Sequence, residues 1–101
     1  MSYESIDPVI LAWTERHALA LFTSIEGMED VTFRCVYVSG DKGESCQIWV
    51  EPPESNHVAL HAAGVETRLD EKLKQDWRVP VTDLEHALEH ALSTVEQWMA
   101  R

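Results

Sequence analysis

Two short segments of alternating residues, separated by a turn sequence, constrain the fold of this chain more than any other feature. Residues 31–39 (VTFRCVYVS) alternate with a period of two, which indicates a half-buried strand. Residues 45–51 return as a second strand, and Pro52-Pro53 end it because proline cannot donate to a ladder. Between them, Gly40-Asp41-Lys42-Gly43 provides glycines for the positive backbone angles of a tight turn. The chain therefore contains an antiparallel hairpin.

Folding this hairpin about Asp41-Lys42 assigns the side chains to two faces. The register places Cys35 opposite Ile48 and Cys46 opposite Tyr37, so both cysteines are expected on one apolar face, where they pack as small hydrophobic residues and carry no redox or metal chemistry. The inward face is predicted to hold Val31, Phe33, Cys35, Tyr37, Cys46, Ile48 and Val50, and the outward face Thr32, Arg34, Val36, Val38, Ser45, Gln47, Trp49 and Glu51.

Helices are predicted at both ends of the chain. Asp7 can cap a helix that has Pro8 at its first position and runs to about residues 16–18. Thr82 and Glu85 have the spacing of a capping box. The helix after them has one apolar face, formed by Leu84, Leu88, Ala91, Leu92, Val95, Trp98 and Met99.

The order of these elements predicts the fold class. Residues 19–25 and 57–63 are two further strand-like runs, the first closed by Glu26-Gly27 and the second by Gly64. We therefore expect an α+β two-layer sandwich: an N-terminal helix, a four-stranded antiparallel meander and a C-terminal amphipathic helix. With 101 residues, the chain (1–101) forms a single domain.

Residues 65–81 are harder to place. Trp77 to Val79 must be extended, because they precede Pro80. The segment either folds back over the outward face of the sheet or leaves that face open, and the sequence supports both alternatives equally. If the face is open, Trp49 lies within a polar rim, as aromatic anchors of binding surfaces do.

Charge excludes several function classes. The chain has 18 acidic and 8 basic residues, a formal charge of −10, which argues against nucleic acid and against anionic membranes as partners. No apolar run approaches the length of a membrane span, and residues 1–8 lack the basic region of a secretory signal. We expect a cytoplasmic protein, whose two cysteines are too few for a disulfide framework.

Motifs for catalysis or metal binding are weak. His86 and His90 match an H-x-x-E-H zinc string, but a third ligand is lacking and both residues point away from the apolar face of their helix. His57 and His61 alternate outward on their strand, and there is no glycine-rich phosphate loop or nucleophile elbow. The expectation is a protein without catalytic residues, metal or cofactor.

The surface instead favours protein binding. In a meander, the turns before residue 31 and after residue 51 lie at the same end of the sheet, so their acidic residues gather there. Such an acidic end attracts a basic partner and accelerates its capture. The predicted partner-binding residues are Glu26, Glu29, Asp30, Glu51 and Glu54 at this end, Trp49 as an aromatic anchor, and Arg34 and Gln47 on the outward face.

A small acidic α+β chain, rich in tryptophan and lacking catalytic motifs, resembles the immunity proteins of bacterial polymorphic-toxin and contact-dependent inhibition systems. The segment from Trp77-Arg78-Val79-Pro80 to Glu96-Gln97-Trp98, a tryptophan strand leading into an amphipathic helix, carries part of this resemblance. The resemblance implies an inhibitor, not an enzyme, that binds a cognate basic toxin domain such as a nuclease and blocks its active site.

Two other classes remain. The chain is also similar to type III secretion chaperones, which are small, acidic α+β proteins that hold an effector segment and form homodimers. We expect a monomer, which favours the inhibitor, whereas an obligate dimer would favour the chaperone. The third class is a small enzyme that uses His57 or His61 with nearby acids.

Overall fold

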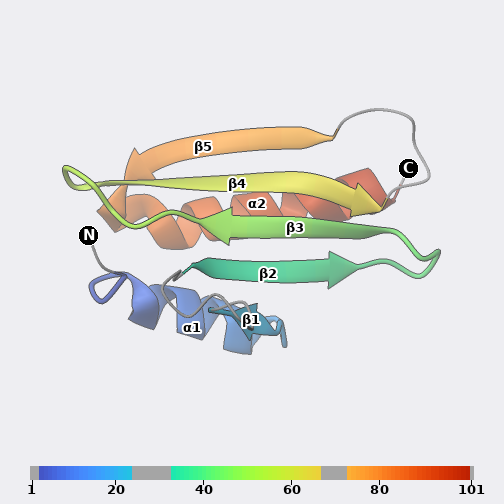
Figure 1. Ribbon diagram of the computed structural model, residues 1–101, viewed down its shortest axis with the longest axis horizontal. Coiled ribbons are helices and arrows are strands. Elements are labelled where there is room, and N and C mark those ends of the chain that lie inside the picture. The colour runs from blue at the N-terminus through green and yellow to red at the C-terminus, as the bar shows by residue number, and fades with distance from the viewer. Residues whose placement is uncertain (1–2, 24–32, 67–72, 101) are drawn as a thin grey trace.

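The computed structural model describes residues 3–23, 33–66 and 73–100. Figure 1 shows a twisted sheet with the helices behind and below it. None of the helices in the described part of the chain is long and apolar enough to cross a membrane. The elements are α1 (Asp7–Arg16), β1 (Leu21–Phe22), β2 (Arg34–Ser39), β3 (Ser45–Val50), β4 (His57–Glu66), β5 (Lys74–Pro80), a 3-10 turn (Val81–Asp83) and α2 (Leu84–Met99).

The sheet is an antiparallel meander in which all five strands follow chain order, β1-β2-β3-β4-β5. The α+β class is thereby confirmed, but the number of strands was underestimated by one. β5 is the added strand: Trp77 and Val79 face the core side while Asp76 and Arg78 alternate with them. β4 also continues through Gly64, where the sequence predicted its end.

The hydrophobic core lies between one face of the sheet and the two helices. Figure 1 shows α2 running behind β3 and β4, with α1 below β2 in this view. The largest fully buried side chain is Trp13 of α1, and the predicted apolar face of α2 packs in the same core against the inner face of the sheet. The core consists of Tyr3, Ile6, Ile10 and Trp13 near α1, Val36, Cys46, Ile48, Val50, Val58, Leu60 and Ala62 from the sheet, and Leu84, Ala87, Leu88, Ala91, Leu92 and Val95 from α2.

The β2–β3 turn is one residue longer than predicted. The Gly40 N–H donates to the Glu44 carbonyl at 2.9 Å, and Gly43 has a φ of +86°. These features define a three-residue loop over 41–43, with glycine in the left-handed conformation that such a loop requires. The longer loop moves the register by one, so that Cys35 pairs with Trp49 and Val36 with Ile48.

Because successive strand residues point to opposite faces, this shift reverses every predicted orientation on β2. Val36, predicted outward, is 1% exposed in the core, and Tyr37, predicted inward, is 46% exposed. Cys35 lies on the outer face and Cys46 on the inner face, so the prediction that they share a face was wrong. Both are buried and free, as expected for packing residues.

The helix starts also differ from prediction. No side chain caps α1 or α2, and residues 81–83 form a 3-10 turn instead of the expected Thr82–Glu85 capping box. The Asp7 carboxylate accepts bonds from Arg34 Nε and Nη2 at 2.7 and 3.0 Å instead of capping α1. In this bidentate, charge-assisted pair both carboxylate oxygens of Asp7 are bonded to the Arg34 guanidinium.

Candidate binding surface on the outer sheet face

The outer face of the sheet is the surface that neither helix covers. Both helices pack on the inner face, and β5 extends the sheet at its edge beside β4. The described residues 73–81 therefore do not fold back over the outer face, which was one of the two alternatives; residues 67–72 lie outside the described part of the chain.

One row of side chains crosses this face from edge to edge. Strand pairing aligns one residue from each of the five strands, and we refer to them as the cross-strand row: Phe22, Cys35, Trp49, His61 and Asp76. Neighbouring residues in such a row lie close enough to interact. The row is aromatic at the β1 end and charged at the β5 end.

The aromatic end of the row is extended by Tyr37, which lies next to the row on the same face and packs edge-on against Phe22 with ring centroids 5.5 Å apart. Phe22 and Tyr37 are both nearly half exposed. Beside them, Gln47 Nε2 donates to Cys35 Sγ at 3.1 Å. Burial raises the pKa of the Cys35 thiol and outweighs the hydrogen bond from Gln47, which lowers it. The thiol is therefore a protonated packing group, and the exposed chemistry here is aromatic.

The charged half is organised around His61. Its Nδ1 lies 2.6 Å from Asp76 Oδ1 and its Nε2 lies 2.6 Å from Glu51 Oε2, while its ring stacks on Trp49 at 4.9 Å between centroids. Burial lowers the pKa of His61, but the bonds to the Asp76 and Glu51 carboxylates outweigh it and the net pKa is raised. The same bond lowers the pKa of Asp76. Together these shifts favour an imidazolium held between two carboxylates.

This arrangement leaves two accessible carboxylates around an imidazole whose nitrogens are both bonded. Because each nitrogen of His61 is bonded to a carboxylate, neither is free to exchange a proton with a substrate. Glu51 and Asp76 each have 54% of their side-chain surface exposed, so they retain acceptor capacity for a cation on a partner. Among the residues that the structure describes, no group of three His, Cys, Asp or Glu side chains could hold a metal ion.

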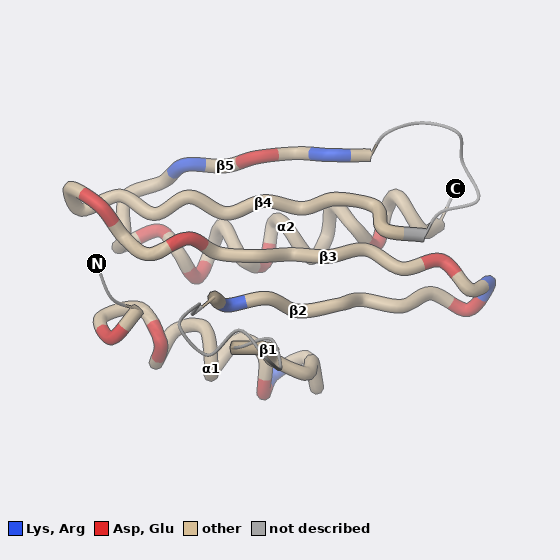
Figure 2. The backbone as a smooth tube through the Cα atoms, viewed as in Figure 1, with Lys and Arg blue, Asp and Glu red and all other residues tan. Residues whose placement is uncertain are grey.

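The remaining predicted site residues divide into three groups. Gln47 and Trp49 lie on the outer face, as predicted, and Glu51 and Glu54 follow the end of β3, where Figure 2 shows acidic residues in red. Arg34 does not share their face, and the prediction that it does was wrong: the register shift turns it toward α1, where it pairs with Asp7 and lies 4.4 Å from the Tyr3 ring centroid. Glu26, Glu29 and Asp30 lie outside the described residues.

Sequence reasoning missed three residues of this surface: Phe22, Tyr37 and Asp76. Phe22 and Tyr37 were not predicted to face outward, and Tyr37 was missed because of the register. His61 was predicted to point outward, but the acids near it were not identified. Asp76 was missed because β5 was not recognised as a strand, although the alternation around Trp77 and Val79 is visible in the sequence.

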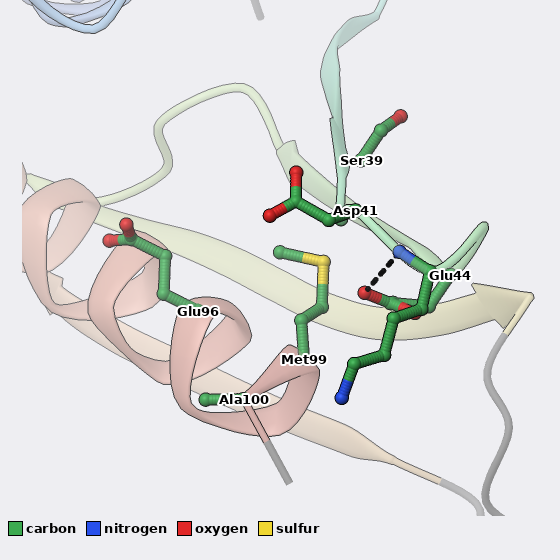
Figure 3. A pocket seen from close by; sticks show the side chains of 8 residues that line it. Ser39, Asp41, Glu44, Glu96, Met99 and Ala100 are labelled. Atoms are coloured by element: carbon green, nitrogen blue, oxygen red, sulfur yellow. Dashed lines mark hydrogen bonds between the residues drawn. The ribbon is translucent and has the colours of Figure 1, made fainter.

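Away from the outer face, a concave region lies between the β2–β3 loop and the end of α2 (Figure 3). It is an open groove of about 380 Å³, and the Glu44 carboxylate turns back within it to accept from the Lys42 backbone N–H at 3.4 Å. The other two acids of the groove are Asp41, in the β2–β3 loop, and Glu96, in the last turn of α2; no described side-chain contact holds either carboxylate in place. The lining residues are Ser39, Gly40, Asp41, Lys42, Glu44, Glu96, Met99 and Ala100.

The histidines of α2 form no site. His86 and His90 are both exposed, in agreement with the predicted helix phase. His90 packs edge-on against Trp77, with centroids 5.8 Å apart.

No family model, no curated protein and no solved structure matches this chain.

Proposed function

We propose that the protein is an immunity-type inhibitor that neutralises a basic toxin domain by binding it through the outer sheet face. The observation that carries the proposal is the cross-strand row together with Glu51, because His61 holds the accessible carboxylates of Glu51 and Asp76 beside the stacked Trp49 ring on a face that neither helix covers. Aromatic anchors next to a polar rim are the common composition of binding hot spots.

The charges of the face indicate which part of it attracts a basic partner. Lys74 and Arg78 lie on the same face as Asp76 at the β5 edge, and Figure 2 shows basic residues in blue and acidic residues in red along β5. Attraction is therefore centred on Glu51 and Glu54, at the end of β3, and not on β5. We place Trp49, adjacent to Glu51 through their common partner His61, at the centre of the contact.

Two observations favour binding over the enzyme alternative. Both nitrogens of His61 are occupied, and Cys35, the thiol of the same row, is buried with a raised pKa. A nucleophile needs an accessible, activated group with a base in reach. The row provides neither, whereas it does provide area and charge for a protein contact.

The direct test expresses the C-terminal domain encoded by the adjacent reading frame with and without this protein. We expect that domain to be toxic alone and harmless in combination. If it is harmless alone, or if no basic protein is recovered with the chain, the inhibitor proposal is refuted.

Two variants locate the contact in that complex. Trp49→Ala should increase the dissociation rate, and Glu51→Lys should lower the association rate and its salt dependence. Glu15→Lys is the matched control, because it makes the same charge change on exposed α1 in the helical layer. Equal effects of Glu51→Lys and Glu15→Lys would leave binding in place but move the contact off the outer face.

A further inference from the structure

β5 forms an open edge of the sheet. In the described part of the chain, no strand pairs with the side of β5 that faces away from β4 (Figure 1). Gly64 N–H donates to the Leu73 carbonyl, and Val81 N–H to the Asn56 carbonyl, each at 2.9 Å. In an antiparallel strand, the N–H and C=O of one residue point to the same side, and the side alternates. The odd-numbered residues of β5 thus bond β4, and the even-numbered residues face the open edge.

The side chains of these even-numbered residues carry alternating charges. Lys74, Asp76 and Arg78 project from the outer face as positive, negative and positive groups. Asp76 is bonded to His61 but keeps 54% of its side-chain surface exposed. Arg78 is exposed and forms no ion pair with any other residue in the described ranges. The edge therefore presents an unused positive charge two residues from an accessible negative one.

We propose that two copies of the chain pair through their β5 edges, antiparallel and centred on Trp77, to form one continuous sheet. Trp77 is the middle residue of Lys74–Pro80, so this register pairs the strand over its whole length. It places Asp76 of each copy opposite Arg78 of the other. The charge pattern of β5 is thus complementary to itself in this orientation, and the two-fold symmetry gives two Asp76–Arg78 ion pairs.

The backbone agrees with this register. Asp76 and Arg78 both direct their free N–H and C=O to the open edge, so facing each other they would exchange two hydrogen bonds, as a hydrogen-bonded antiparallel pair does. Trp77, whose N–H and C=O bond β4, would meet its copy at the two-fold axis without hydrogen bonds. Lys74 would face Pro80, which has no N–H and ends the ladder. Since pairing consumes both β5 edges, the assembly closes at two copies.

Pairing in the plane of the sheet leaves the outer face uncovered. The two cross-strand rows would lie on the same side of the combined sheet, each accessible to a partner. A contact through one strand is reversible, unlike the obligate dimer expected of a chaperone, and is compatible with the inhibitor proposal without depending on it.

Sedimentation velocity of the intact chain over a range of concentrations tests the dimer. We expect the mass to rise from 11.5 kDa toward twice that value. Arg78→Asp places like charges opposite each other twice and should weaken association by about tenfold or more. Lys74→Glu is the matched control, because it also replaces a positive by a negative side chain on the same strand and face. Since Lys74 would lie opposite the uncharged Pro80, this change should alter the association constant by less than about twofold.

A mixing experiment tests the register itself. Asp76→Arg and Arg78→Asp should each impair self-association, but mixed together they restore opposite charges at both pairs and should form a heterodimer in native mass spectrometry. If Asp76→Arg does not fold, hydrogen exchange of the wild-type chain replaces it: the amides of Asp76 and Arg78 should become protected as concentration rises, and the Trp77 amide should not change. The proposal is overturned if the chain is a monomer at its highest soluble concentration, or if Lys74→Glu weakens association as much as Arg78→Asp does. It is also overturned if neither the heterodimer nor concentration-dependent protection is observed.

Discussion

Replacing Leu88 by alanine measures how α2 is held against the sheet. Leu88 is fully buried in the core. The change removes three carbon atoms, which corresponds to about 2.4 kcal/mol at about 0.8 kcal/mol per methylene. The cavity left behind, at most about 80 Å³, adds up to about 1.9 kcal/mol at about 24 cal/mol per Å³. We therefore expect the free energy of unfolding to fall by about 2.5 to 4.5 kcal/mol, a large fraction of the stability of a domain of this size.

Urea unfolding followed by tryptophan fluorescence gives this difference, with His90→Ala as the control on the same helix. His90 is exposed and contacts only the edge of Trp77 among described aromatic rings, so its loss should cost less than about 1 kcal/mol. If the two variants lower the free energy of unfolding equally, the helix phase and the packing of α2 on the inner face are both wrong. An unchanged slope of the denaturant dependence is needed for the comparison to report stability alone.

Two further predictions concern charged groups. Because the pKa of His61 is raised in the folded state, its bonds stabilise the fold fully below the unfolded pKa near 6.5, and this stability is lost as pH rises through the folded pKa. Because the pKa of Asp76 is lowered, its bond stabilises the fold above about pH 3.8, and this stability is lost as pH falls through the folded pKa. The difference in unfolding free energy between wild type and His61→Asn should thus be greatest at about pH 4 to 6.5 and shrink above it; a difference independent of pH would contradict the bonded geometry. For Asp7 and Arg34, a double-mutant cycle with Asp7→Ala and Arg34→Ala should give a coupling energy of about 1 to 3 kcal/mol, because the pair is bidentate and partly buried; additive losses would show that the two do not interact.

The elements of this fold could be predicted from local patterns, but their register could not. The apolar face of α2 and the alternation of β3 and β4 depend on residues close in sequence, and the structure confirms both. The hairpin sequence Gly40 to Gly43 permits both a two-residue and a three-residue loop, and the difference of one residue reverses all of β2. The register that forms places Val36 in the core and Arg34 beside Asp7, and these contacts join residues far apart in sequence.

The candidate site was predictable in part for the same reason. Trp49 and Gln47 lie on β3, whose faces were assigned correctly, so they face outward as expected. Arg34 was misplaced with the rest of β2, and its bond to Asp7 joins residues 27 positions apart. The partners of His61 come from β5 and from the end of β3, so they become visible only once five strands are aligned.

The two cysteines lie on opposite faces of one sheet, and this gives the protein a built-in pair of kinetic reporters. Cys35 has its β1 neighbour on a strand of only two residues, so we expect local opening at this edge of the sheet to admit a thiol reagent from the outer side. Cys46 is enclosed between the sheet and the helices, so its labelling requires the layers to separate. The ratio of the two labelling rates would thus distinguish local opening at the sheet edge from global unfolding, without the introduction of any probe.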